Sequence, residues 1–207
     1  MNQRKESRNP WSWVPTLYFG QGVPYILTII VSTVMYKNLG LNNAQITFYT
    51  GWLYLPWVIK PFWSPFVDQL KTKRFWVVSM QLLMGAAFAA IGLTLPLPGY
   101  IVWSLIIFWL VAFSSATHDI AADGFYMLGL SEYQQSFFVG IRNTFWRVAS
   151  ISCQGGLVYL SGVLAQQNGG NYRSSWAIIL LGTGIVYIAI GLFHKFVLPY
   201  PISDLTR

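Results

Sequence analysis

Six apolar stretches, each long enough to cross a lipid bilayer as a helix, constrain the fold of this 207-residue chain more than any other feature. Because a hydrocarbon layer of roughly 30 Å takes about 20 helical residues to cross, six spans leave no room for a soluble domain. The runs are continuous rather than alternating, which excludes a transmembrane β-barrel. We therefore predict an all-α, polytopic membrane protein with six transmembrane helices. They are expected at about residues 13–36, 44–66, 75–96, 100–127, 136–165 and 175–197.

The same runs give the domain organisation. A polar tail at 1–12 precedes a transmembrane bundle at 13–197, and a short segment at 198–207 follows it. The tail is too polar, and the first apolar run too long, for a cleaved signal peptide, so we expect the first helix to remain in the mature protein.

Charged residues make up only 9% of the chain, and their positions predict its orientation. A cytoplasmic amino terminus leaves only Lys37 and Arg173 outside. The net charge of +7 is therefore interpreted as a topology signal. Nucleic acid is excluded as a partner, because the basic residues are scattered beside apolar runs instead of forming a groove. The cytoplasmic cations would be Arg4, Lys5, Arg8, Lys71, Lys73, Arg74, Lys195 and Arg207.

The remaining charged residues that fall inside predicted spans are the strongest functional signal. Each charge at the bilayer centre costs at least roughly 2.5–3.5 kcal/mol, so these side chains are expected to face the protein interior or a wet cavity. They are Lys60, Asp119, Asp123, Arg142 and Arg147.

Spacing predicts how four of these charges pair. Asp119 and Asp123 are four residues apart and share one face of their helix. A short polar turn at 131–135 joins the fourth and fifth spans, which predicts an antiparallel hairpin. Positions of equal depth in that hairpin match Asp123 with Arg142 and Asp119 with Arg147. The two pairs are either structural braces or part of a substrate and ion pathway.

Lys60 has no predicted partner, so it gives the bundle a surplus positive charge. It lies among Pro56, Pro61 and Pro65, which kink a helix and free backbone groups that neighbours or water must satisfy. Because interrupted segments of this kind usually line a cavity, we favour a functional Lys60 over one that merely reaches the membrane interface.

Three further sites each carry two interpretations. The glycines around Gln21 either permit close helix packing or open the first helix, so that Gln21 and freed carbonyls meet a solute. His118 is either the hydrogen-bond partner of Asp119, which we favour, or a proton acceptor. Asp68, with Lys71 and Arg74 after it, belongs either to a solvated loop or to a charge latch between helix ends.

Enzymatic motifs are absent from the sequence. There is no H-E-x-x-H, no phosphate-binding glycine loop with Lys and no nucleophile elbow, and the single Cys153 excludes a Cys-based metal site within one chain. An intramembrane metalloenzyme would need His118, Asp119 and Asp123 to hold the metal. We predict that the chain is not an enzyme and carries no metal or other cofactor.

Two segments carry a resemblance to a known family. Residues 62–68, Phe-Trp-Ser-Pro-Phe-Val-Asp, and residues 114–124, Ser-Ser-Ala-Thr-His-Asp-Ile-Ala-Ala-Asp-Gly, resemble the AmpG-like muropeptide permeases of the major facilitator superfamily. Acetyl-coenzyme A transporters are relatives with a similar second motif. Lys60 and Arg147 also match basic residues of the permeases. Asp68 matches the acidic position of the superfamily's loop between helices two and three, although several neighbours depart from that pattern.

The resemblance implies proton-driven import of anionic muropeptides across the bacterial inner membrane. In that interpretation Asp119 or Asp123 takes up the coupling proton, Lys60 and Arg147 attract the anionic solute, and Asp68 helps to close the cytoplasmic side. Only the first half of the permeases is matched, so residues 198–207 would begin a central cytoplasmic loop. A second six-helix half is then an expected partner, besides the lipid bilayer. A truncated, non-transporting bundle that binds a partner is the alternative.

Overall fold

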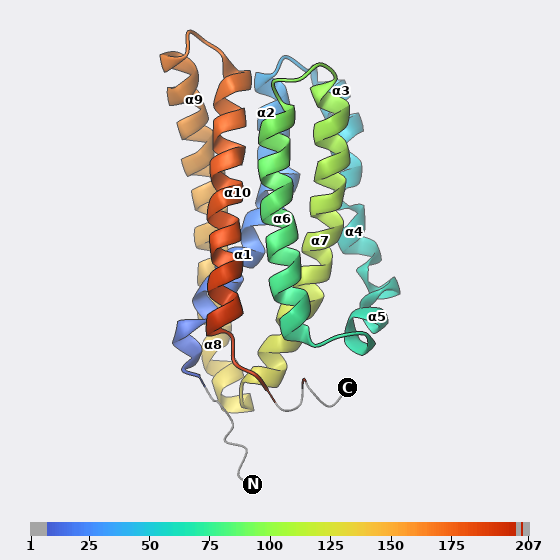
Figure 1. The fold of residues 1–207 in the computed structure, drawn as a ribbon, viewed down its shortest axis with the longest axis vertical. Coiled ribbons are helices and arrows are strands. Elements are labelled where there is room, and N and C mark those ends of the chain that lie inside the picture. Colours follow the sequence, from blue (N-terminus) through green and yellow to red (C-terminus); the bar gives the residue numbers. More distant parts are fainter. Residues whose placement is uncertain (1–7, 202–203, 205–207) are drawn as a thin grey trace.

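A computed structural model describes residues 8–201 and residue 204, and these residues form helices and connecting turns without a strand. The prediction of an all-α chain is therefore confirmed for the described residues. Helical stretches that are long and apolar enough to cross a membrane lie side by side along the long axis of the bundle (Figure 1). The structure has five such stretches within its described part: Pro10–Asn38, Lys73–Thr94, Tyr100–Gly129, Glu132–Gln167 and Tyr172–Val197.

The first stretch is interrupted at a proline. It comprises the 3-10 turn η1 (Pro10–Ser12), α1 (Val14–Ile26), the π-helical turn η2 (Leu27–Val31) and α2 (Ser32–Asn38). Pro24 has no N–H to donate to the carbonyl of Gly20, and the hydroxyl of Tyr187 donates to that carbonyl instead, at 2.5 Å. A Cβ on Gly22 would lie 2.9 Å from the Cβ of Ala149. The helix is thus closely packed at Gly22, and the carbonyl that Pro24 frees meets protein; a contact between Gln21 and a solute stays a prediction.

The predicted span at 44–66 is not one continuous helix, so six helices are not confirmed. It is a series of short pieces: α3 (Asn43–Thr50), η3 (Gly51–Tyr54), α4 (Leu55–Ile59), η4 (Lys60–Phe62) and α5 (Ser64–Gln69). Pro56, Pro61 and Pro65 each occupy the second position of one of these pieces, because a proline fits the first turn of a helix but breaks its interior. The series still runs from one end of the bundle to the other (Figure 1).

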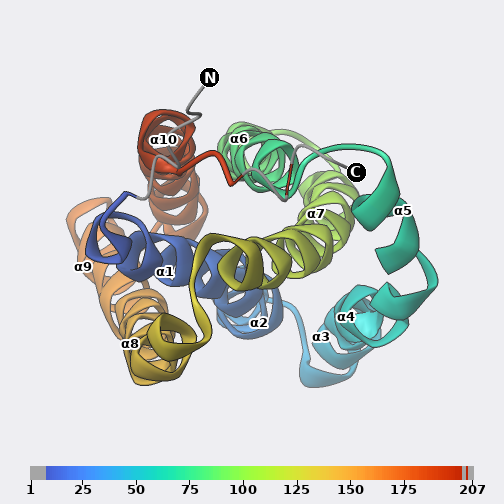
Figure 2. The same ribbon diagram turned by 90° about the horizontal axis from the view of Figure 1, so that it is seen from below.

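The remaining helices complete the bundle. They are α6 (Lys73–Thr94), α7 (Tyr100–Gly129), α8 (Glu132–Ile151), the π-helical turn η5 (Ser152–Leu157), α9 (Val158–Gln167) and α10 (Tyr172–Val197). Seen along its axis, the bundle has α1 and α7 in the middle, the α3–α5 series on one side and α8, α9 and α10 on the other (Figure 2). Side chains of α7 can therefore meet both sides.

The two ends of the bundle differ in charge. One end holds the start of α1 and the end of α10, where Arg8 donates to the carbonyl of Phe196. Arg74 at the start of α6 donates to the carbonyl of Lys195 at this same end. Lys37 and Arg173 lie at the opposite end, in the last turn of α2 and the first turn of α10. The described cations are thus distributed unequally, whereas Arg4, Lys5 and Arg207 lie outside the described residues.

Two residues beyond α10, Tyr200 and Asp204, lie at the start of α6. The carboxylate of Asp204 accepts hydrogen bonds from the backbone N–H groups of Lys73, at 2.7 Å, and Arg74, at 3.2 Å. The guanidinium of Arg74 stacks on the ring of Tyr200, 3.8 Å from its centroid. Asp204 therefore satisfies amides of the first turn of α6 that have no partner within the helix, and its negative charge suits a helix amino terminus.

Candidate functional site

One of the two predicted ion pairs is formed. Asp123 on α7 and Arg142 on α8 approach to 3.3 Å, as the hairpin spacing predicts. Their side chains are 41% and 28% exposed, so the pair is half-buried. The Tyr18 hydroxyl donates to the same carboxylate at 3.1 Å, and the guanidinium lies 4.5 Å from the Tyr18 ring centroid and 5.1 Å from that of Tyr126. Asp123 is therefore held by a cation, a hydroxyl and two aromatic rings that position the cation.

The second predicted pair is wrong. Asp119 and Arg147 form no ion pair in the structure, and Arg147 is exposed on α8. Equal depth does not bring them together. Arg147 lies five residues after Arg142 on α8, and five residues along a helix of 3.6 residues per turn rotate a side chain by about 140°. If Arg142 faces α7, Arg147 turns away from it.

Asp119 has partners from other elements instead. Its Oδ2 accepts a hydrogen bond from the indole N–H of Trp57 on α4, at 3.1 Å. The charge of Lys60, at the start of η4, and the side chain of Gln21 on α1 also act on this carboxyl group. The other oxygen, Oδ1, is buried and has no hydrogen-bond partner among the described residues. Lys60, left without a predicted partner by the sequence, thus acts on Asp119 through its charge, although the two side chains form no ion pair in the structure.

An aromatic cluster borders this carboxylate. The Tyr25 ring contacts Trp57 at a centroid distance of 5.1 Å and Trp146 at 5.8 Å, and Tyr54 stacks near Trp57 at 6.3 Å. These rings come from α1, α4, α8 and η3. The site therefore combines one carboxylate, one nearby ammonium group and an aromatic wall, all contributed by segments that are far apart in the sequence.

His118 is not the hydrogen-bond partner of Asp119. Its Nε2 lies 3.1 Å from Nε2 of Gln81 on α6, and the Gln81 Oε1 lies 2.8 Å from Nδ1 of His194 on α10. Neither Gln81 nor His194 was predicted from the sequence to belong to a site. A signal was available, because both are polar residues inside otherwise apolar spans, where polar residues are costly.

The loop between α5 and α6 forms contacts at the end where α10 finishes. Asp68 pairs with Lys73, and the Lys71 ammonium lies 5.9 Å from the ring centroid of Phe75. Arg74 donates to the carbonyls of Lys195 and, at 3.4 Å, Leu198. Arg74 therefore links two helix ends, as a latch would, whereas Asp68 and Lys71 stay within their own loop and helix start.

The outer face of α8 is polar although α8 belongs to a stretch long and apolar enough to span a membrane. Polar and glycine residues recur at helical spacing and are exposed. The hydroxyls of Ser136 and Thr144 donate to carbonyls of their own helix. Acyl chains cannot satisfy the amide of Asn143 or the charge of Arg147, so this face needs protein or water against it. The exposed residues are Ser136, Gly140, Asn143, Thr144 and Arg147.

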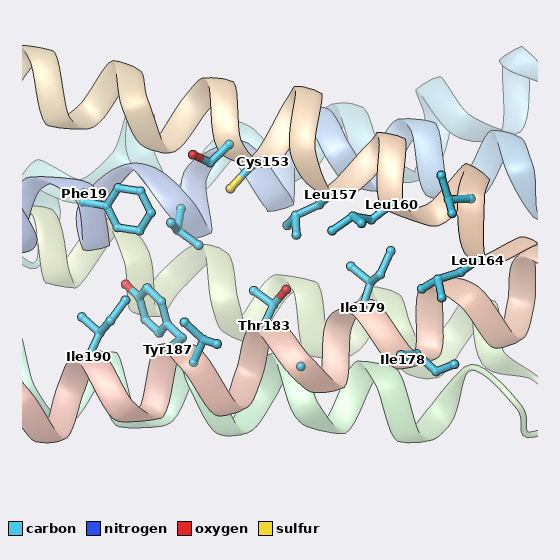
Figure 3. A pocket seen from close by; sticks show the side chains of 15 residues that line it. Phe19, Cys153, Leu157, Leu160, Leu164, Ile178, Ile179, Thr183, Tyr187 and Ile190 are labelled. Atoms are coloured by element: carbon cyan, nitrogen blue, oxygen red, sulfur yellow. The ribbon is translucent and has the colours of Figure 1, made fainter.

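An apolar hollow lies elsewhere, between η5 and α9 on one side and α10 on the other, over α1 (Figure 3). Its volume is about 420 Å³. Leu157 and Leu160 face Ile179 across it, and Cys153 and Thr183 are among its few polar groups (Figure 3). None of the predicted site residues lines it, and its chemistry does not suit an anionic solute. Among the described residues there is also no group of three His, Cys, Asp or Glu side chains that could hold a metal.

Comparisons with known proteins identify the family. The BT1 family matches residues 21–195. The chain belongs to the BT1 family. It is 23% identical over 180 residues to the AmpG 4 transporter candidate of Rickettsia conorii. That alignment covers 83% of the chain and 41% of the relative, so the chain spans less than half the length of this relative. No solved structure matches the chain.

The family membership settles two of the predictions. The resemblance to AmpG-like transporters is confirmed. The prediction that the chain is not an enzyme is also confirmed, because its relatives are transporters. The chain is thus a transporter-family membrane protein with several apolar helices.

Proposed function

We propose that the chain is the amino-terminal six-helix part of a proton-coupled transporter for a small anionic solute. The observation that carries this proposal is Asp119: a carboxylate inside a membrane-spanning helix, with one oxygen free and Lys60 close by. Ionisable residues at this depth are expensive, and in transporters they mark ion and substrate paths. In this proposal the broken α3–α5 series is the sixth crossing and delivers Lys60 to the bundle interior.

The coupling follows from competition for Lys60. An ionised Asp119 attracts the Lys60 ammonium, whereas a protonated, neutral Asp119 does not. Uptake of one proton at Asp119 therefore frees one positive charge to attract an anionic group of the solute. Asp123 is less suited to this role, because Arg142 and Tyr18 already occupy it.

The exposed polar face of α8 supports a second half as partner. In a major facilitator fold the solute lies between two six-helix halves near the bilayer midplane. Arg147 on that face would then meet the solute or the second half, rather than lipid. Asp68 and Arg74, at the end that holds the α5–α6 loop, would act in closing that side.

Orientation and substrate complete the proposal. The excess of cations at the end that holds the start of α1 favours a cytoplasmic amino terminus. AmpG-like relatives favour anionic muropeptides as the solute and the bacterial inner membrane as the location. An acetyl-coenzyme A-type anion is the competing solute, because a surplus cation attracts carboxylates and phosphates alike.

Uptake by membrane vesicles tests the proposal. Vesicles that contain the chain, with and without a co-expressed second half, receive an inward proton gradient and labelled anhydro-muropeptide or acetyl-coenzyme A. We expect gradient-driven uptake that Asp119→Asn reduces at least tenfold, the equivalent of about 1.4 kcal/mol. Glu132→Gln, a carboxylate exposed at the start of α8, is the matched control and should leave uptake unchanged.

Two outcomes would contradict the proposal. Unchanged uptake in Asp119→Asn would exclude the coupling role proposed for Asp119, and unchanged uptake in Asp123→Asn as well would exclude such a role for both carboxylates. Absence of gradient-driven uptake in every combination would instead favour a non-transporting, partner-binding bundle.

A further inference from the structure

Four polar side chains from four helices form a continuous hydrogen-bonded chain inside the bundle. Thr16 on α1 lies 2.9 Å from His194 on α10, through Oγ1 and Nε2. His194 then contacts Gln81 on α6 at 2.8 Å, and Gln81 contacts His118 on α7 at 3.1 Å. The side chains of Gln81, His118 and His194 are fully buried. Burial of so many polar atoms is costly unless each has a partner, which makes this chain a specific feature.

The chain fixes the tautomer of each histidine. With its amide oriented as in the structure, Gln81 donates from Nε2, so Nε2 of His118 accepts and the proton of His118 lies on Nδ1. The Gln81 oxygen can only accept, so His194 carries its proton on Nδ1. Its Nε2 then accepts from the Thr16 hydroxyl, which in this arrangement turns away from its other acceptor, the Trp13 carbonyl. Gln81 thus holds His118 as an Nδ1–H donor.

That donor has no acceptor among the described residues. Nδ1 of His118, Oγ of Ser115 and Oδ1 of Asp119 are all buried without a hydrogen-bond partner. Ser115 and His118 are fully buried. At 100° per residue, Ser115 lies on the helix face between His118 and Asp119, one turn nearer the start of α7, towards which helical side chains lean. Ser115 is therefore the helix neighbour of both His118, three residues on, and Asp119, four residues on, so the unpaired atoms belong to adjoining faces of α7.

We propose that a single buried water, bound by Ser115 and by Nδ1–H of His118, donates to the free oxygen of Asp119. A buried water needs two to four polar partners, and these three atoms supply them. His118 is then a positioning residue: it favours the ionised form of Asp119 without touching the solute, and Gln81 keeps it in the donating tautomer. This inference rests on the proposed function, for which it sets the pH at which Asp119 takes up the coupling proton.

Other charges act on the same neighbourhood, and the test must separate them from His118. The side chain of α6 that contacts His118 is the neutral Gln81. The titratable or charged groups that act on Asp119 or His118 are His194 and Tyr187 of α10, Asp123 of α7, Tyr25 of α1 and Lys60 of η4, and the neutral side chains of Gln21 and Trp57 also act on Asp119. Arg142 of α8 and Tyr18 of α1 act on Asp123.

Nitrogen-15 NMR of histidine-labelled protein tests the inference directly, because the chain contains two histidines. The full chain in lipid nanodiscs should show both rings protonated at Nδ1. Asp119→Asn should shift the Nδ1 signal of His118 and leave that of His194 unchanged. Asp123→Asn, one turn further along α7, is the matched control and should move neither. An unshifted His118 signal in Asp119→Asn, or a proton on Nε2 of His118, would overturn the inference.

Transport measurements provide the functional test. In Ser115→Ala, a small change that keeps the helix, and in Gln81→Met, the pH midpoint of gradient-driven uptake should rise by about one unit, a tenfold change in proton affinity. An unchanged midpoint in both variants would overturn the inference, although the proposed function would stand. Uptake that is unchanged in Asp119→Asn would contradict the proposed function. The change in the His118 NMR signal would still show whether the water-linked site exists.

Discussion

Asp119 and Asp123 lie one turn apart on α7, yet the structure treats them differently. Asp123 is half-exposed and paired with Arg142 at 3.3 Å, with a tyrosine hydroxyl on the same carboxylate. Asp119 has an indole N–H on one oxygen, a free second oxygen and an ammonium group nearby. A carboxylate whose charge is paired with a cation at 3.3 Å suits a brace, whereas one whose hydrogen bond comes from a neutral indole can exchange partners. The difference teaches that equal charge and near-equal depth do not imply equal roles.

The largest expected effect comes from removing the cation of the brace. Arg142→Leu leaves Asp123 half-buried without its ion pair, so we expect the free energy of unfolding to fall by about 2–3 kcal/mol, near the lower limit for buried pairs. Arg147→Leu, whose side chain is exposed, should change it by less than about 0.5 kcal/mol. Denaturant unfolding in detergent micelles measures both.

A double variant sharpens this comparison. Combining Asp123→Asn with Arg142→Leu removes both charges, so part of the lost stability should return. A double variant less stable than Arg142→Leu alone would show that the pair is not a brace.

The next effect concerns Lys60. Lys60→Met should leave stability nearly unchanged but raise the solute concentration for half-maximal uptake at least tenfold, or about 1.4 kcal/mol. The reason is that the ammonium attracts the solute anion only in the wild type. Lys195→Met, an exposed lysine in the last turn of α10, serves as the control. If Lys60→Met instead destabilises the protein as Arg142→Leu does, both carboxylates belong to braces.

The smallest effect comes from the two neutral donors. Trp57→Phe removes the indole N–H from Asp119 and keeps an aromatic ring, so we expect a loss of about 1 kcal/mol in unfolding free energy. Tyr18→Phe removes the hydroxyl from Asp123, which retains Arg142, and should cost less. Thermal unfolding of the two variants side by side measures the difference, and the reverse order would contradict the assignment of Asp119 as the less satisfied carboxylate.

Contacts within the α7–α8 hairpin could be predicted from the sequence, because the depth of a residue along two antiparallel helices follows from residue spacing. Asp123 and Arg142 were predicted in this way. The partner of Asp119 could not be found by depth alone, because rotation about the helix axis turned Arg147 outwards and tertiary packing brought Trp57 and Lys60 in. Sequence patterns also do not show how Gln81 and His194 meet His118, since three separate helices must pack before those side chains approach one another.

One part of the fold, the segment at 44–66, was predicted incorrectly for a similar reason. Hydropathy identified 44–66 as apolar, but it does not register that a proline every few residues divides a helix into short pieces. The five other spans lack such a series of prolines, and their predicted positions agree with the helices within several residues.

The Asp204 carboxylate gives α6 a cap that is encoded 131 residues after Lys73. During synthesis, the first amides of α6 therefore gain this acceptor only after nearly all of the described chain has been made. Replacement of Asp204 by alanine would remove about 1 kcal/mol from a helix in the interior of the sequence. The cap of α6, one of the earlier helices, thus forms only after α10 has been made, so this helix end receives its stabilising contact out of the order in which the chain is synthesised.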